Sequence, residues 1–254
     1  MELFPAVDLR AGRCVRLVEG DFARETVYWD DPVAVAGGFA AAGARWVHVV
    51  DLDAARSGDP VNRDTVRRIA AESGLRVQAG GGVRSLGDAA SLLDAGVERV
   101  VLGTAAVDTP ALVAEVAQRW PGGVAVGLDH RDGEVRLRGW LEGGGRRVAD
   151  LVPEAVAAGA AAVIVTDIGR DGMLAGPDVV GLAGLLEATG APLVASGGVA
   201  SLADLHVLGA VRSGGRGLVG AIVGKALYEG RFGVAEAVAA CAALSPAERQ
   251  GGAG

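Results

Sequence analysis

The sequence has little of several residues on which common protein classes depend. Its 254 residues include only two cysteines, Cys14 and Cys241, which cannot make a disulfide framework and show no metal-site spacing. The longest apolar stretch, residues 155–165, is too short to cross a bilayer. Residues 1–5 show no basic and apolar leader. We therefore expect a cytoplasmic protein with no membrane partner.

Positive charge is also scarce. The 24 basic residues are outnumbered by 31 acidic ones, and the formal net charge of −7 argues against nucleic acid as a partner. Lys225 is the only lysine. A Schiff-base aldolase needs a lysine that projects from a strand into the site, whereas Lys225 follows a glycine at the end of a predicted strand. Pairing with a phosphate or exposure to solvent is more natural there, so we expect no covalent catalysis by lysine.

The motifs of several enzyme classes are missing as well. The sequence has no G-x-S-x-G, H-E-x-x-H or P-loop pattern, so a serine triad, a zinc protease site and a Walker lysine are unsupported. The three histidines, His48, His130 and His206, lack metal-ligand spacing, and we predict no metal site. His48, on the second predicted strand, is equally compatible with contact to a substrate and with a hydrogen-bonded position in the interior.

Short β-branched runs alternate with alanine-rich helical patterns along the chain. The strand candidates are residues 3–7, 46–50, 76–79, 99–102, 124–128, 162–166, 192–195 and 220–223. The helix candidates are residues 32–42, 62–72, 86–94, 110–119, 148–158, 179–189, 202–208 and 234–244. The strands are continuously apolar, as in a parallel sheet covered by helices.

Eight βα units in about 250 residues are typical of a (β/α)8 TIM barrel, with a doubly wound open sheet as the alternative. We predict a single α/β barrel domain over residues 1–245 and a flexible C-terminal tail over residues 246–254. Two matching halves support the barrel. Some pairs of similar residues lie 116 positions apart and others 121 apart. The pairs are Asp51 with Asp167, Gly81 with Gly197, Gly103 with Gly224, and Asp8 with Asp129.

Glycine is abundant, with 41 residues, and part of this excess lies where strands are predicted to end. In a barrel that rim holds the active site, and glycine lets backbone N–H groups approach an anion at a helix N-terminus. Tight turns are the other reason for glycine there. We predict two phosphate-binding sites on opposite sides of one rim. Their candidate residues are Gly81, Gly82, Gly103, Thr104, Gly172, Ser196, Gly197, Gly198, Gly224 and Lys225.

Carboxylates lie between the two predicted phosphate sites. Asp8 and Asp129 end the first and fifth predicted strands, and Asp171 lies in the loop after the sixth. A carboxylate at the end of an apolar strand is costly unless it is paired or used. For Asp51 and Asp167 we favour helix capping or loop hydrogen bonding. The remaining chemistry is proton transfer by carboxylates on a phosphorylated substrate.

These segments resemble the ProFAR isomerase family (phosphoribosylformimino-5-aminoimidazole carboxamide ribotide isomerase) of histidine biosynthesis, from residue 3 to about residue 240. The motifs that carry the resemblance include Phe4-Pro5-Ala6-Val7-Asp8-Leu9, His48-Val49-Val50-Asp51-Leu52-Asp53, Gly80-Gly81-Gly82-Val83-Arg84, Gly127-Leu128-Asp129, Thr166-Asp167-Ile168-Gly169-Arg170-Asp171-Gly172, Ser196-Gly197-Gly198-Val199 and Ile222-Val223-Gly224-Lys225. The resemblance implies a (β/α)8 barrel, no cofactor, and an Amadori rearrangement of an aminoaldose that carries two phosphates.

The mechanistic hypothesis assigns two catalytic carboxylates. Asp171 acts as a general acid on the ribose ring oxygen, and Asp8 removes the C2′ proton as a general base. Asp129 orients the substrate or Thr166. The other substrate-binding candidates are Arg16, His48, Arg138 and Trp140.

The segment Arg136-Leu137-Arg138-Gly139-Trp140 is similar to a loop of actinobacterial dual-substrate phosphoribosyl isomerases. That resemblance implies a second activity on phosphoribosylanthranilate in tryptophan biosynthesis, with Trp140 covering the larger substrate and Arg138 and Arg16 approaching the smaller one. Three features depart from the subgroup. They are the short stretch at residues 141–145, Met173 where threonine is common, and Ala79 where serine is frequent.

Two other functions remain open at this stage. One is the sister cyclase of the same pathway, a lyase that would need a glutaminase partner. The other is a non-catalytic phosphate-binding barrel. For the isomerase we expect a small-molecule bisphosphate substrate, no obligate protein partner and a monomer.

Overall fold

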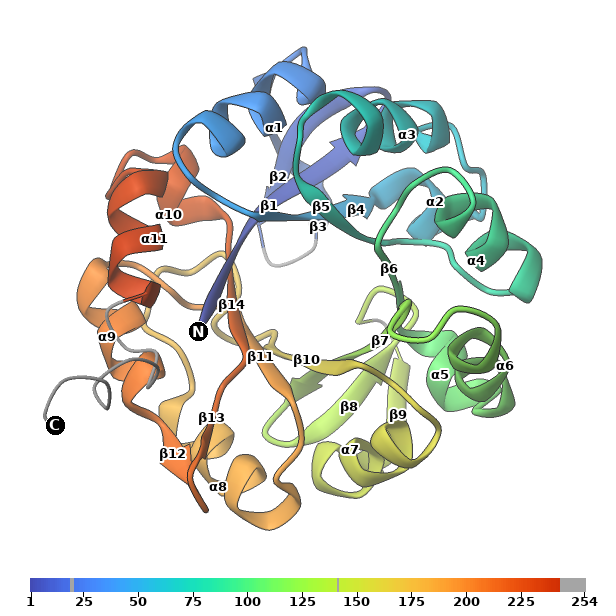
Figure 1. The fold of residues 1–254 in the computed structure, drawn as a ribbon, viewed down its shortest axis with the longest axis vertical. Coiled ribbons are helices and arrows are strands. Elements are labelled where there is room, and N and C mark those ends of the chain that lie inside the picture. The colour runs from blue at the N-terminus through green and yellow to red at the C-terminus, as the bar shows by residue number, and fades with distance from the viewer. Residues whose placement is uncertain (19–20, 141, 243–254) are drawn as a thin grey trace, which may run out of the picture.

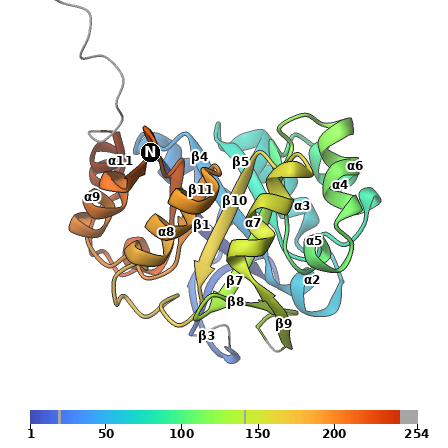
Figure 2. The ribbon, with the colours of Figure 1, turned by 90° about the horizontal axis from the view of Figure 1, so that it is seen from below.

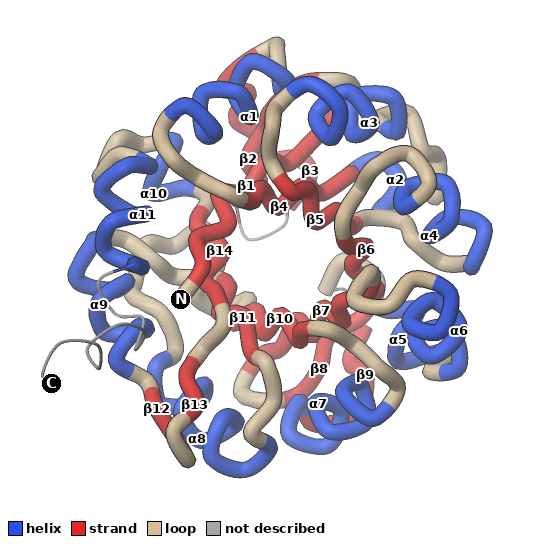
Figure 3. Tube along the Cα trace, viewed as in Figure 1, coloured by secondary structure: helices blue, strands red, loops and turns tan. Residues whose placement is uncertain are grey.

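The computed structural model, which describes residues 1–18, 21–140 and 142–242, shows a closed barrel of eight parallel strands (Figures 1 and 3). Parallel pairing runs once around the barrel and closes between the last strand and the first. In ring order the strands are β1 (Glu2–Arg10), β4 (Trp46–Asp51), β5 (Arg76–Gly80), β6 (Arg99–Leu102), β7 (Val124–Arg131), β10 (Ala162–Asp167), β11 (Leu193–Ser196) and β14 (Gly220–Val223). The predicted (β/α)8 barrel is confirmed.

Helices form the outer ring around the strands (Figure 1). The helices are α1 (Pro32–Ala41), α2 (Leu52–Ser57), α3 (Arg63–Glu72), α4 (Leu86–Leu93), α5 (Thr104–Asp108), α6 (Ala111–Arg119), α7 (Val148–Ala157), α8 (Val179–Thr189), α9 (Leu202–Ala210), α10 (Lys225–Tyr228) and α11 (Val234–Ala242). The eight predicted helices are present, and the short α2, α5 and α10 were not predicted. The end of the last predicted helix and the predicted tail, residues 246–254, lie outside the described residues. Within the described ranges, no helix is both long and apolar enough to cross a membrane.

Two hairpins project from one end of the barrel, beyond the strand ends where the loops lead into helices (Figure 2). One consists of β2 (Arg13–Val18) and β3 (Asp21–Trp29), and the other of β8 (Glu134–Leu137) and β9 (Glu142–Arg147). A third, two-residue pair, β12 (Arg212–Ser213) with β13 (Arg216–Gly217), lies away from this end. None of the three was predicted.

The two projecting hairpins repeat the 121-residue offset seen in the sequence. Ala11 and Gly12 form the turn after β1 with φ of 47° and 77°, and Asp132 and Gly133 form the turn after β7 with φ of 53° and 79°. Positive φ at both central residues is the geometry of a two-residue turn that suits twisted strands. Asp-Gly is a hairpin signal in the sequence, so the second hairpin could have been predicted.

The interior of the barrel is packed with side chains rather than hollow. An inner cluster lies within the ring of strands, and a larger core fills the layer between strands and helices. The inner cluster consists of Phe4, Ala6, Trp46, Ala125, Ala162, Ile164, Val194 and Ile222. Burial of a large apolar side chain contributes about 1.5–3 kcal/mol to stability, so these layers hold the rim rigidly.

A buried asparagine fixes the turn of the first hairpin to the neighbouring βα unit. Asn62 is 0% exposed, and its Nδ2 donates to Asp51 at 2.7 Å and to Asp53 at 2.8 Å. Its Oδ1 accepts from the backbone N–H of Gly12 at 2.8 Å. Asn62 precedes α3 but does not cap it with its side chain, because the side chain is committed to this network.

Replacing Asn62→Asp is expected to lower the free energy of unfolding by about 3–5 kcal/mol, because a buried carboxylate would face Asp51 and Asp53 in place of the NH₂ group that donates to both. Urea unfolding at neutral pH measures the change. Asp64→Asn, at an exposed position of the same helix, is the matched control and is expected to cost less than about 1 kcal/mol. Equal effects of the two exchanges would contradict this role for Asn62.

Candidate functional site

Three carboxylates lie at the end of the barrel that carries the hairpins. Asp8 lies on β1, Asp129 lies on β7, and Asp171 follows β10 in a turn. The negative charge of Asp171 raises the pKa of both Asp8 and Asp129. All three carboxylates therefore lie close enough for their charges to interact.

Asp8 is paired with a cation supplied by the first hairpin. Nη1 of Arg16, on β2, lies 2.6 Å from Oδ2 of Asp8, and their side chains are only 13% and 17% exposed. Burial raises the pKa of Asp8, whereas the charge of Arg16 opposes that rise. The Arg16 guanidinium also lies over the ring of Tyr228, 5.6 Å from its centroid. The Tyr228 hydroxyl in turn donates to the backbone oxygen of Ala6 on β1 at 2.8 Å.

Within the described ranges, the hydrogen-bond donors to Asp129 are all neutral. Nε1 of Trp140 donates to its Oδ2 at 2.8 Å, and Thr166, its register partner on β10, forms a second hydrogen bond. Burial raises the pKa of Asp129, because these two hydrogen bonds only partly offset the loss of solvent. The structure thus brings together Asp129, Trp140 and Thr166, three of the predicted substrate-binding residues.

Arg138 lies apart from that group. Its side chain is 59% exposed and contacts Glu142 at 2.5 Å and Asp108 at 3.7 Å, while its backbone N–H donates to Oγ1 of Thr104 at 3.0 Å. Arg138 and Trp140 both have positive φ, 51° and 74°. This unusual backbone turns the indole toward Asp129 and leaves the guanidinium at the surface.

Asp51 and Asp167 shape the loops, as the sequence predicts. Asp51 caps α2 by accepting from the N–H of Ala54 at 3.0 Å. Asp167 accepts from the N–H of Gly169 at 2.9 Å and from Nε of Arg170 at 3.0 Å. Its backbone oxygen also accepts from the N–H of Asp171 at 2.9 Å, which positions the carboxylate of Asp171.

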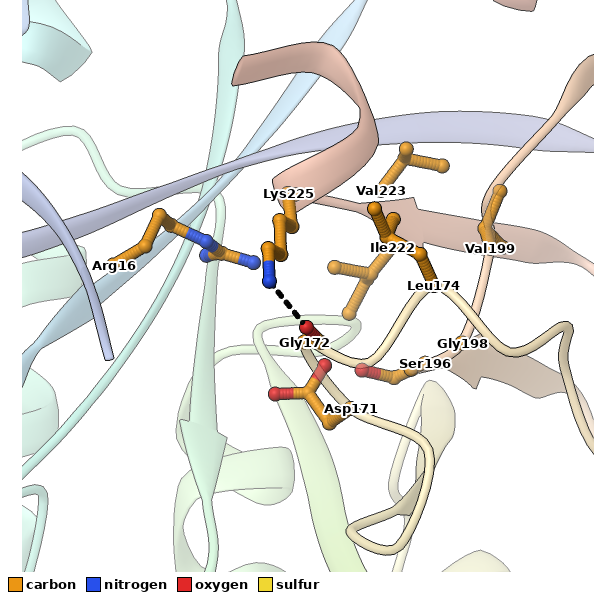
Figure 4. Close-up of a pocket in the computed structure, with 12 residues that line it drawn as sticks. Arg16, Asp171, Gly172, Leu174, Ser196, Gly198, Val199, Ile222, Val223 and Lys225 are labelled. Carbon is orange, nitrogen blue, oxygen red and sulfur yellow. Dashed lines mark hydrogen bonds between the residues drawn. The ribbon is translucent and has the colours of Figure 1, made fainter. Parts of the chain in front are cut away.

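A pocket opens beside Asp171 at the ends of β11 and β14 (Figure 4). It is lined by six of the ten predicted phosphate-binding residues, Gly172, Ser196, Gly197, Gly198, Gly224 and Lys225. Arg16 and Lys225 enter it from the same side (Figure 4), and Nζ of Lys225 donates to the backbone oxygen of Gly172 at 2.8 Å. A Cβ on Gly224 would overlap the Arg16 guanidinium, so a side chain at this position would displace Arg16 from its present place.

The other four predicted phosphate-binding residues follow β5 and β6, which the ring order places opposite β11 and β14. Gly103 precedes α5 as Gly224 precedes α10, with φ of −93° and −114°. Gly81 and Gly82 have φ of 94° and 71°, and a Cβ on either would overlap the backbone around Asp51 or Ala54. Close packing of the preceding loop therefore requires the glycine pair, and Thr104 uses its hydroxyl to hold Arg138.

His48 is hydrogen-bonded inside the barrel. Its Nδ1 lies 3.0 Å from Nε2 of Gln78, and burial together with the charge of Arg16 lowers the pKa of the imidazole to about 4. Gln78 and its second partner, Arg99, were not predicted as site residues. The feature of the sequence that could have indicated Gln78 is a polar amide in the middle of the strand predicted at residues 76–79.

Comparison with known proteins identifies the family. The family model described as histidine biosynthesis protein matches residues 2–233. The chain belongs to this family. Among its relatives, a protein of Picosynechococcus sp. is 49% identical over 94% of this chain and 93% of its own length, and one of Bacillus velezensis is 47% identical over 93% and 96%. A protein of Anaeromyxobacter dehalogenans is 50% identical over 95% of this chain and 100% of its own length. All three are named 1-(5-phosphoribosyl)-5-((5-phosphoribosylamino)methylideneamino)imidazole-4-carboxamide isomerase.

Asp129→Asn is expected to stabilise this histidine biosynthesis protein at neutral pH. Because burial raises the pKa of Asp129 in the folded state, wild type loses stability as pH rises from the unfolded value of about 3.9 through the folded value. The asparagine variant avoids that loss, which is about 1.4 kcal/mol for every tenfold difference in proton affinity between the folded and unfolded states.

Melting curves at several pH values measure the difference. The gap between variant and wild type should vanish at about pH 2 to 3, below the unfolded-state pKa, where both states of Asp129 are largely protonated, and should grow toward a plateau at higher pH. A gap that shrinks with rising pH would contradict the assignment.

Proposed function

We propose that the chain isomerises ProFAR, the compound that appears in the names of the relatives, to its phosphoribulosyl isomer in histidine biosynthesis. The observation that carries the proposal is the placement of Asp8 and Asp171. Arg16, which pairs with Asp8 at 2.6 Å, lines the same pocket as Asp171, and both carboxylates lie between glycine-bearing strand ends that the ring order places on opposite sides of the barrel. A substrate with a phosphate at each end fits such a rim.

The pocket beside Asp171 is the better defined of the two proposed phosphate sites. Arg16 and Lys225 supply positive charge there, and the glycines leave backbone N–H groups open to an anion. Gly81, Gly82, Gly103 and Thr104 would hold the second phosphate. Fixing both ends aligns the reacting carbons with the carboxylates, which lowers the entropic part of the barrier.

In the proposed reaction, Asp171 donates a proton to the ring oxygen, the C1′–O bond breaks, and a protonated Schiff base forms. Asp8 then accepts the C2′ proton, and the enolamine tautomerises to the aminoketose. The two roles need opposite protonation states. The guanidinium of Arg16, 2.6 Å from Asp8, favours the ionised base. Asp129 and Thr166 orient the substrate, and Trp140 covers it.

Asp8→Asn is expected to lower kcat for ProFAR by about 10²–10⁴, because an amide cannot accept the C2′ proton. Asp171→Asn should cause a loss of the same order through the ring-opening step. Conversion of ProFAR by each purified variant measures the effect. Asp132→Asn, at an exposed turn where asparagine tolerates positive φ, is the matched control and should keep wild-type activity.

Near-wild-type turnover by a folded Asp8→Asn variant would refute the assignment of the base. Consumption of the ketose isomer instead of ProFAR would favour the cyclase-type lyase. Binding of both phosphates without turnover by wild type would favour the non-catalytic barrel.

The loop at Arg138 and Trp140 supports a second proposed activity, isomerisation of phosphoribosylanthranilate. Among the residues that the structure describes, only exposed ion pairs, to Glu142 and Asp108, hold the Arg138 side chain, and such pairs are worth about 0–1 kcal/mol. Release of Arg138 from the surface therefore costs little, and an inward position would present a guanidinium to the anthranilate carboxylate.

Arg138→Ala is expected to lower kcat/KM for phosphoribosylanthranilate about 10-fold to 100-fold, the worth of a charge-assisted hydrogen bond, and to change that for ProFAR less than about threefold. Trp140→Ala should show the opposite preference. Parallel assays with both substrates measure the ratio. Equal losses on both substrates would contradict this division of roles.

We also propose that the enzyme is cytoplasmic, that it is a monomer, and that it has no obligate protein partner. This chain supplies every side chain named in the reaction, and both of its cysteines, Cys14 and Cys241, are buried free thiols, which suits a reducing compartment.

A further inference from the structure

A row of polar side chains crosses three adjacent strands inside the barrel. The strand register pairs His48 of β4 with Gln78 of β5, and Gln78 with Arg99 of β6. His48 also lies beside Ala6 of β1, two residues before Asp8 in that strand. Because inward-facing residues alternate along a strand, the row forms the layer directly beneath the carboxylates.

The hydrogen bonds along the row have a fixed direction. Nη1 of Arg99 lies 3.2 Å from Oε1 of Gln78. A guanidinium can only donate, so the amide must turn its oxygen toward Arg99 and its NH₂ group toward His48. That NH₂ group can likewise only donate, so Nδ1 of His48, 3.0 Å away, must accept. The ring proton then resides on Nε2.

We infer that Arg99 and Gln78 are positioning residues that hold His48 as the neutral Nε2–H tautomer, so that it offers a hydrogen-bond donor rather than a base to an oxygen of the bound sugar phosphate. The inference rests on the proposed function for the identity of that ligand. Within the described part of the chain, no hydrogen bond occupies Nε2 of His48, which leaves this donor open.

The electrostatic surroundings keep the ring neutral. Arg16, the charged group that acts on His48 from the hairpin, lowers the pKa of the imidazole, as does burial. Gln78 is 0% exposed, so its amide has no access to water as an alternative partner. Burial also lowers the pKa of Arg99, and its Nε is buried without a hydrogen-bond partner. Packing alone does not explain why this guanidinium is buried at a cost in free energy.

The other half of the barrel lacks this row. The residues at the matching repeat positions are Ile164, Val194 and Gly220, which the register pairs in the same way. The first two belong to the apolar inner cluster. Apolar side chains are thus sufficient to pack the barrel interior at these positions, and the polar row is a feature of the half that contains Asp8 and Arg16.

Two-bond ¹H–¹⁵N correlation spectra of the substrate-free protein, labelled in histidine, test the tautomer directly. Only three histidines contribute, and exposed His206 serves as the reference signal. Wild-type His48 should carry its proton on Nε2. Arg99→Met should give mixed tautomers, because the Gln78 amide is then free to flip. Arg99→Lys, which keeps a donor, should restore the wild-type pattern.

Two further variants sharpen the test. Gln78→Glu should move the proton to Nδ1, because a carboxylate accepts from both neighbours. Arg76→Met is the matched control. Arg76 stacks on Trp46, 4.1 Å from the ring centroid, as Arg99 does at 4.8 Å, but it pairs with Glu98 rather than Gln78. This control should leave His48 unchanged.

Kinetics test the donor role separately. Arg99→Met and Gln78→Glu should lower kcat/KM for ProFAR about tenfold, the worth of one hydrogen bond, while Arg76→Met stays within about twofold. The positioning role is overturned if wild-type His48 carries its proton on Nδ1, or if the tautomer of His48 does not change in the Arg99→Met variant. Unchanged kcat/KM in variants with an altered tautomer overturns the donor role. An inactive wild type whose tautomer depends on Arg99 overturns the proposed function alone.

Discussion

The ion pair between Asp8 and Arg16 is the contact on which the geometry of the barrel mouth depends. Burial raises the pKa of the Asp8 carboxyl, and the guanidinium 2.6 Å away opposes that effect. The same guanidinium lies over Tyr228, whose hydroxyl is bonded to the backbone of β1. The strand, the first hairpin and α10 are therefore joined through one side chain. The protonation state of the proposed base depends on all three.

The two halves of the barrel supply equivalent carboxylates and then separate them by their partners. Asp8 and Asp129 occupy matching positions, and each strand continues into a hairpin with the same turn. At the position that matches Arg16, however, the second half has Leu137. In the part of the chain that the structure describes, Asp129 accordingly has only Trp140 and Thr166 as hydrogen-bond donors. One carboxylate beside a cation and one without it are suited to different roles in proton chemistry.

The glycines at the rim allow close packing of the loops, in addition to any role in binding an anion. Gly81 and Gly197 have φ of 94° and 90°, and a Cβ on either would meet the backbone oxygen of the aspartate that ends the preceding strand, Asp51 or Asp167. The loops after neighbouring strands are thereby packed against each other. The same close approach brings the turn that carries Asp171 against the glycines of the pocket. Close packing at this rim thus depends both on the positive φ that glycine tolerates and on its lack of a side chain.

The sequence alone determined the barrel, its eight longer helices and the carboxylates at the rim. Apolar runs and helical periodicity depend on nearby residues, and parallel strands bring their ends to one edge whatever their details. Only the tertiary structure decided which partner each carboxylate has, because Arg16 reaches Asp8 through a hairpin that folds back over the rim.

The row of His48, Gln78 and Arg99 likewise depends on register between strands 21 to 30 residues apart. Periodicity within one strand does not specify that register. The outward position of Arg138 follows from a positive-φ loop whose side chains face opposite ways. In each case the deciding contact joins residues that no local pattern relates, and the hydrogen-bonding requirement of a buried polar group then fixes the geometry.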